Sequence, residues 1–130
     1  MFKNKNLSLP YLSAGFPSPA ADFTEISISL DKYLIRNPIA TFMAYANGDS
    51  MVDANIYNGD IIIVDRSLNA KNGDIVVAML NGEFLIKKLV LIKNKLCLIP
   101  ENSKYPVFEI SKEASFDIWG VVTYSIHKQR

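Results

Sequence analysis

The sequence contains one cysteine and one histidine in 130 residues. The single cysteine, Cys97, excludes a disulfide within the chain, and its place in the apolar run 95–99 predicts a buried thiol. Zinc sites need several cysteine or histidine side chains at characteristic spacings, and the sequence has no such pattern. Asp60 and Asp74 each follow Asn-Gly, where aspartate is ordinary turn chemistry. We therefore expect no metal ion and no cofactor.

Excess charge and long apolar runs are also missing. The net charge is +1, whereas domains that bind nucleic acid directly usually carry a strongly basic surface, so we expect no such binding. No apolar run approaches the roughly 20 residues of a membrane span, and residues 1–10 lack a signal-peptide core. There is no glycine-rich phosphate loop. These absences favour a soluble protein of the cytoplasm.

Short apolar runs separated by turn signals predict a mostly-β fold of short, largely antiparallel strands. The expected strands are residues 23–29, 42–46, 61–64, 75–80, 83–90, 96–99, 107–110 and 116–126. Asn81-Gly82 predicts a type I′ hairpin between two of them. Helical turns are expected only at 30–36 and, as a loop or short helix, at 51–57. Trp119 is predicted to be in the core, with an edge position at a dimer interface as the alternative.

Residues 1–22 differ from the rest and predict an extended arm ahead of one domain, 23–130. Pro10, Pro17 and Pro19 each remove a backbone donor and resist helix formation. The small residues Ala14 and Gly15 leave the peptide bond between them accessible. Residues 9–12 are short and apolar and form a candidate docking segment for a partner such as a sliding clamp. The simplest alternative for the whole segment is a plain mobile N-terminus.

The tight turn Gly48-Asp49-Ser50 between two apolar runs is a candidate site for a nucleophilic serine. The usual reading of such a tripeptide is a plain turn. His127, near the C-terminus and without an acidic neighbour in sequence, is expected to be a solvated tail residue rather than the base. A lysine can replace histidine, although with a pKa of about 10.4 only roughly one lysine in 2,500 is neutral at pH 7.

Burial lowers the pKa of a lysine, and the apolar run 84–90 surrounds Lys87 and Lys88. In a strand, each of these lysines has apolar neighbours two residues away on its own face, so periodicity does not choose between them. The alternative is that one lysine reaches over the edge of the core and the other is solvated.

The order of four motifs resembles the self-cleaving serine-lysine peptidase domain of LexA and UmuD proteins. The motifs are Gly-Asp-Ser-Met at 48–51, Asn-Gly-Asp-Ile-Ile-Ile-Val-Asp at 58–65, Asn-Gly-Asp-Ile-Val-Val-Ala at 72–78 and Gly-Glu-Phe-Leu-Ile-Lys-Lys-Leu at 82–89. Residues 14–22, 98–103 and 118–122 resemble UmuD proteins in particular. The similarity spans nearly all of residues 9–130. Leu85 departs from the pattern, because relatives usually have threonine there.

The resemblance implies that Ser50 is the nucleophile, that Lys87 is its general base, and that the chain cuts its own Ala14–Gly15 bond. Backbone N–H groups of Asp49, Ser50 and Met51 would form the oxyanion hole. It also implies that RecA filaments on single-stranded DNA stimulate cleavage during the SOS response. The processed homodimer would then serve a Y-family translesion polymerase of the UmuC type, in a bacterium or from a plasmid or phage.

Three other functions are compatible with parts of this pattern. A LexA-type repressor needs a DNA-binding domain ahead of the cleavage site, and only fourteen residues precede Gly15, so this would require a truncated chain. A signal peptidase would require a membrane anchor. A non-enzymatic module would keep Ser50 and Lys87 as structural relics and use the arm to bind a polymerase or clamp.

Overall fold

The computed structural model describes residues 9, 11, 12, 14, 15, 29–111 and 115–130. The chain divides into two units, Met1–Arg36 and Asn37–Arg130. Most of the predicted arm and nearly all of the predicted strand at 23–29 lie outside the described residues. The domain boundary predicted near residue 22 falls there too, and it stays a prediction.

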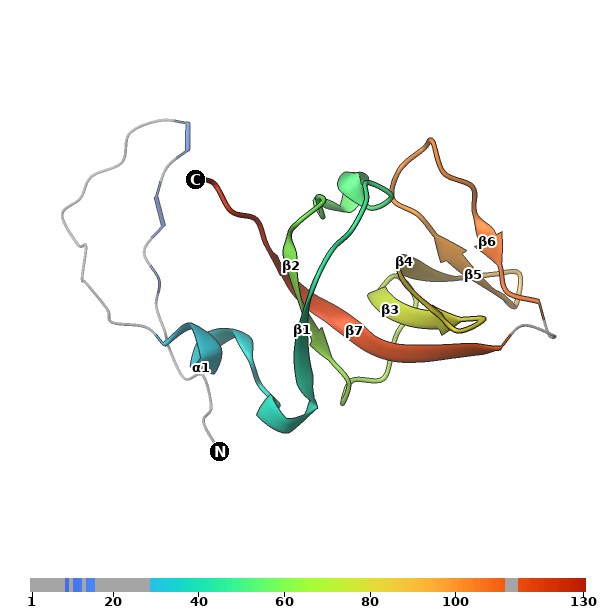
Figure 1. Ribbon diagram of the computed structural model, residues 1–130, viewed down its shortest axis with the longest axis horizontal. Helices are drawn as coiled ribbons and strands as arrows, with labels where there is room; N and C mark the ends of the chain where they lie inside the picture. Colours follow the sequence, from blue (N-terminus) through green and yellow to red (C-terminus); the bar gives the residue numbers. More distant parts are fainter. Residues whose placement is uncertain (1–8, 10, 13, 16–28, 112–114) are drawn as a thin grey trace. The chain divides into compact units, whose positions relative to one another are not determined.

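In the first unit, helix α1 spans Leu30–Leu34 (Figure 1). The last helical bond runs from the Ile35 N–H to the Asp31 carbonyl, and the helix stops before Pro38 because Ile35 is already extended. The sequence prediction of one or two helical turns at this place is therefore confirmed. Ala14 and Gly15, the two residues of the predicted cleavage site, form a bend.

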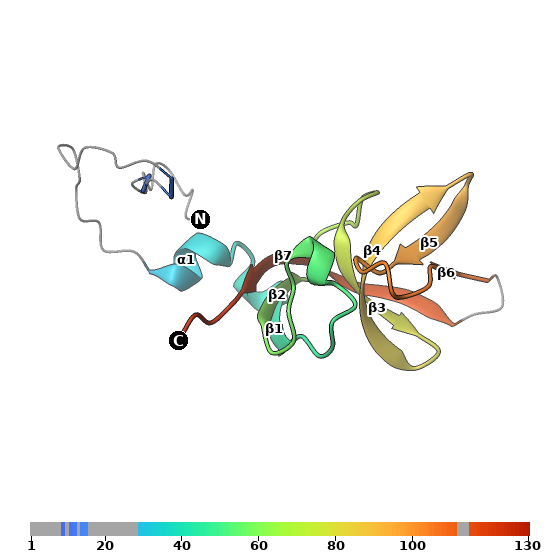
Figure 2. The same ribbon diagram turned by 90° about the horizontal axis from the view of Figure 1, so that it is seen from above.

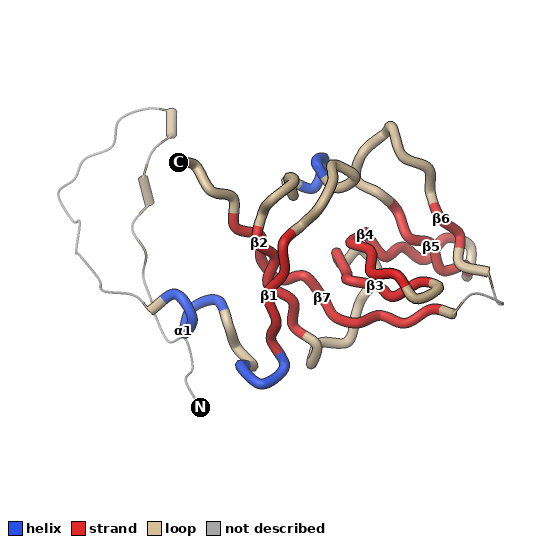
Figure 3. The backbone as a smooth tube through the Cα atoms, in the orientation of Figure 1, coloured by secondary structure: helices blue, strands red, loops and turns tan. Residues whose placement is uncertain are grey.

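The described part of the second unit is built on one seven-stranded antiparallel sheet, in the order β1-β2-β7-β3-β4-β5-β6 (Figures 1 and 3). The strands are β1 Thr41–Tyr45, β2 Ile61–Asp65, β3 Ile75–Leu80, β4 Glu83–Ile92, β5 Lys95–Ile99, β6 Phe108–Glu109 and β7 Phe116–Ile126. The helices described in this unit are two short 3-10 helices, η1 Pro38–Ala40 before β1 and η2 Val52–Ala54 between β1 and β2. The mostly-β prediction is confirmed, as is a short helix within 51–57.

The last strand, β7, joins the two halves of the sheet by lying between β2 and β3 (Figure 2). Its pairing shifts register once against each neighbour, which is the sign of a β-bulge. Gly120 lies where β7 crosses Val64 of β2, and a Cβ there would stand 2.6 Å from Val64 Cγ1. Glycine at this position lets the two strands approach closely.

The hairpin between β3 and β4 sets the position of the lysine strand. Asn81 and Gly82 have φ values of 51° and 82°, as a type I′ turn requires, and Leu80 pairs with Glu83. The predicted hairpin is confirmed. From this turn the register runs back along the strands and places Lys87 opposite Val76.

The core consists of two clusters. The first contains Ala46, Met51, Ile56, Ile62, Val64 and Val77, and the second contains Val76, Ala78, Leu89, Leu98 and Val121. Successive residues of β3 fall in different clusters, as expected for opposite faces of a sheet. Cys97 is buried, as predicted.

Trp119 is half-buried and packs against the first cluster. Its ring contacts the rings of Phe42 and Phe84, and the Arg66 guanidinium lies 4.8 Å from its centroid. Because β7 is an inner strand of the sheet, the edge-strand alternative for Trp119 is wrong and the core prediction is closer.

Candidate active site

Ser50 lies on the turn that follows β1. The chain reverses at Gly48, whose φ of 97° favours glycine, and the Gly48 N–H donates to Asn58 Oδ1 over 2.8 Å. Met51, directly after the serine, is buried in the first core cluster and anchors the turn. The predicted tight turn is therefore present, and it places the serine against packed apolar residues.

Lys87 meets Ser50 from strand β4. Its Nζ donates a hydrogen bond of 2.8 Å to Ser50 Oγ, although the two residues are 37 positions apart in sequence. Only 8% of Lys87 is exposed, and the buried Leu89 lies two residues along the same strand face. Periodicity had left two lysines open, and the structure brings this one to the serine.

Lys88 points elsewhere. Its Nζ lies 3.5 Å from Glu101 Oε1, and its side chain is more than a third exposed. The adjacent lysines therefore have different environments: Lys87 is buried beside a hydroxyl, and Lys88 is partly exposed beside a carboxylate.

Burial lowers the pKa of Lys87, because the charged ammonium loses water that few polar groups replace. A lower pKa enlarges the neutral fraction of the amine at a given pH. Only the neutral amine can accept a proton from a serine, so the environment changes this lysine in the direction that a general base needs.

Two hollows meet at the Ser50–Lys87 pair. The larger, about 390 Å³, extends over apolar side chains that include Ile56, Val77 and Trp119. The smaller, about 200 Å³, is lined by residues that include Pro100, Tyr105 and Pro106. Ser50, Leu85 and Lys87 line both.

Residues 101–105, which follow β5, form hydrogen bonds to the turn that carries Ser50. Asn102 Nδ2 donates to the Asp49 carbonyl over 2.8 Å, and the Asp53 N–H donates to the Glu101 carbonyl over 2.6 Å. The Tyr105 hydroxyl donates to the Asp49 carboxylate, whose acceptance of that bond raises the pKa of Tyr105. The sequence reading singled out neither Asn102 nor Tyr105. The one signal was the likeness of residues 98–103 to UmuD proteins.

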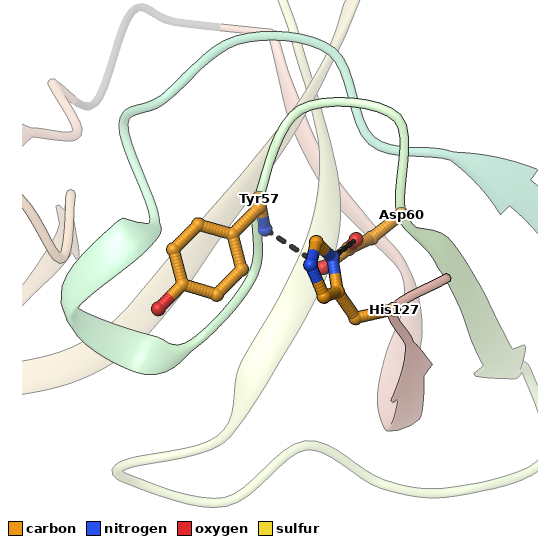
Figure 4. Close-up of polar contacts among 3 residues, drawn as sticks. All are labelled: Tyr57, Asp60 and His127. Atoms are coloured by element: carbon orange, nitrogen blue, oxygen red, sulfur yellow. Dashed lines mark hydrogen bonds and ion pairs between the residues drawn. The ribbon is translucent and has the colours of Figure 1, made fainter. Parts of the chain in front are cut away.

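His127 is exposed, as expected for a tail residue, but it also has a partner that the sequence did not indicate. Its Nδ1 lies 2.5 Å from Asp60 Oδ1, and its ring is 5.2 Å from that of Tyr57 (Figure 4). The histidine has an acidic partner after all, because β7 returns beside β2 and brings together residues 67 positions apart. It does not line either hollow beside Ser50.

Asp60 performs the turn role predicted for it. Its carboxylate accepts the Tyr57 N–H over 2.8 Å, and this bond, with a further contribution from His127, lowers the pKa of Asp60. Asp74 likewise accepts the Lys71 N–H over 2.8 Å.

Within the described residues, no helix has the length and apolarity needed to cross a bilayer.

The chain belongs to the peptidase S24-like family, whose sequence profile matches residues 8–123. It is 44% identical over 124 residues to Protein MucA of Salmonella typhimurium, covering 92% of this chain and 84% of MucA. It is 46% identical over 117 residues to Protein SamA of the same species, covering 90% and 81%.

The LexA repressor of Stenotrophomonas maltophilia is 34% identical over 118 residues, with 88% of this chain matching 56% of the repressor. These similarities confirm the resemblance to LexA- and UmuD-type proteins. The UmuD-like relatives MucA and SamA have higher identity to this chain than the LexA repressor has.

Proposed function

We propose that this peptidase-family chain cleaves itself, with Ser50 as nucleophile, Lys87 as general base and Ala14–Gly15 as the bond that is cut. The observation that carries the proposal is the 2.8 Å hydrogen bond between Lys87 Nζ and Ser50 Oγ beside an apolar cavity. A buried lysine bonded to a serine hydroxyl is the pair that serine-lysine chemistry requires.

In the proposed reaction, neutral Lys87 takes the hydroxyl proton while Ser50 Oγ attacks the carbonyl carbon of Ala14. Backbone N–H groups of Asp49, Ser50 and Met51 stabilise the oxyanion. The protonated lysine then gives its proton to the departing Gly15 amine, leaving an ester between Ser50 and Ala14. Lys87 next activates a water molecule that hydrolyses the ester. The products are a fragment ending at Ala14 and a chain beginning at Gly15.

Regulation would come through the arm. A scissile bond tethered to the enzyme makes the attack effectively unimolecular, so weak recognition of the segment suffices. Docking of the arm over the pair would also exclude water from Lys87 and lower its pKa further. A partner that favours the docked arm would then accelerate cleavage without adding any chemistry.

The biological setting we propose follows the UmuD resemblance and the similarity to MucA and SamA. RecA filaments on single-stranded DNA would promote docking of the arm during the SOS response in the bacterial cytoplasm. The processed homodimer would serve as accessory subunit of a Y-family polymerase of the UmuC type, and residues 9–12 would contact a sliding clamp.

Intact mass tests the proposal on purified full-length chain incubated at about pH 10 beside Ser50→Ala, Lys87→Ala and Lys88→Ala. We expect loss of residues 1–14 in the wild type and in Lys88→Ala, and no change in the other two. If alkaline pH alone gives no cleavage, the same series is repeated with RecA, ATP and single-stranded DNA. Processing of Ser50→Ala at the normal rate would instead favour an outside protease acting on a non-enzymatic module.

A further inference from the structure

Asn102 is a buried amide whose two polar ends are both used. It is 9% exposed and lies between β5 and β6, 53 residues from the turn that it contacts. Its Nδ2 donates to the Asp49 carbonyl over 2.8 Å, and its Oδ1 accepts the Lys104 N–H over 3.0 Å. A side chain held at both ends has one orientation, so it can fix the position of what it binds.

The group that Asn102 holds belongs to the same peptide unit as the Ser50 N–H. The Asp49 carbonyl and the Ser50 N–H lie in one plane and point in opposite directions across a trans peptide bond. Fixing the direction of the carbonyl therefore fixes the direction of the N–H. The other donor to this carbonyl, the Val52 N–H, is 3.3 Å away, so the bond from Asn102 is the shorter of the two.

We infer that Asn102 is a positioning residue that aims the Ser50 N–H at the carbonyl oxygen of the bond to be cut. This rests on the proposed self-cleavage and adds the reason why the amide would be ready before the arm docks. Preorganised donors are effective because they need no reorientation as the oxyanion forms. Tyr105 differs, because it binds the Asp49 carboxylate and leaves the peptide plane free to turn.

A misdirected oxyanion donor and a perturbed base have different kinetic effects. Loss of one oxyanion donor costs other enzymes roughly 100- to 1,000-fold in rate. A misdirected donor should cost somewhat less, about 10- to 100-fold, in the cleavage rate at the alkaline plateau. Because Asn102→Ala introduces no charge near Lys87, the pH at which the rate levels off should not move.

The test compares full-length wild type, Asn102→Ala, Asn102→Asp and Ser50→Ala by intact mass across the alkaline range, with RecA filaments added where the wild type needs them. Asn72→Ala is the matched control, since its Oδ1 accepts the Leu91 N–H over 2.9 Å on an exposed turn away from the serine. Asn102→Asp keeps the acceptor for Lys104 and the side-chain shape, and it replaces Asn102→Ala if thermal unfolding shows that variant to be unfolded.

A plateau lowered at least tenfold in the Asn102 variants, with Asn72→Ala near wild type, supports the inference. An Asn102 variant within twofold of wild type would overturn it and leave the proposed function intact, provided Ser50→Ala stays uncut. A shift in the levelling pH of Asn102→Ala without loss of plateau would also overturn it. An uncut wild type under all conditions, or a cut Ser50→Ala, would remove both proposals.

Discussion

If Lys87 is the base, its burial determines how steeply cleavage depends on pH. A lysine with the ordinary pKa of 10.5 is neutral in only about one molecule in 3,000 at pH 7, and each unit by which the pKa falls raises that fraction tenfold. Burial lowers the pKa of Lys87. The cleavage rate at the alkaline plateau should therefore exceed the rate at pH 7 by a factor below about 3,000.

The assay is the first-order loss of full-length chain, followed by intact mass in steps from pH 7 upward. The logarithm of the rate should rise with a slope of one and then level off below pH 10.5. Lys87→Arg should not cleave at any pH, because a guanidinium keeps its proton throughout this range. Lys88→Arg is the matched control and should cleave normally, since Lys88 pairs with Glu101 away from the serine.

Two results would refute parts of this reasoning. A flat or falling profile would remove lysine as the base, and levelling at or above pH 10.5 would keep the lysine but refute the effect of burial.

The stability of the fold gives an independent check on the pKa of Lys87. Because the folded pKa of Lys87 is the lower one, the unfolded chain binds more protons between the two values, and stability must rise with pH in that window. Lys87→Met should lack this rise and be more stable at pH 7.

Two further predictions concern the fold. Gly120→Ala should lower the free energy of unfolding in urea by roughly 1–3 kcal/mol, because its Cβ would press on the buried Val64; an unchanged midpoint would show that β7 can move aside. The lowered pKa of Asp60 means that its stabilising contribution is present above pH 3.8 and is lost as the pH falls through the folded value. Asp60→Asn should therefore weaken the dependence of stability on acid pH, whereas His127→Ala should keep most of it because the Tyr57 N–H remains.

The strands could be predicted because their signals are local. Short apolar runs produced the bounds of β3 and β7, and Asn81-Gly82 produced the hairpin after β3, since φ preferences act within a few residues. The order of the strands could not be read in this way. That β7 inserts between β2 and β3, and so gives His127 its partner Asp60, depends on long-range packing that no short pattern records.

For the candidate site, the sequence by itself determined the chemical groups: a serine on a glycine turn and a lysine in an apolar strand. Strand periodicity did not determine which of two adjacent lysines meets the serine, because both strand faces carry apolar neighbours; only the family resemblance favoured Lys87. The tertiary structure decided that through the register of β3 and β4, which turns Lys87 toward Ser50 and Lys88 toward Glu101. It also brought the buried Asn102 to the Asp49 carbonyl. Buried polar groups need hydrogen-bond partners, and these partners can come from any part of the chain that the fold places nearby.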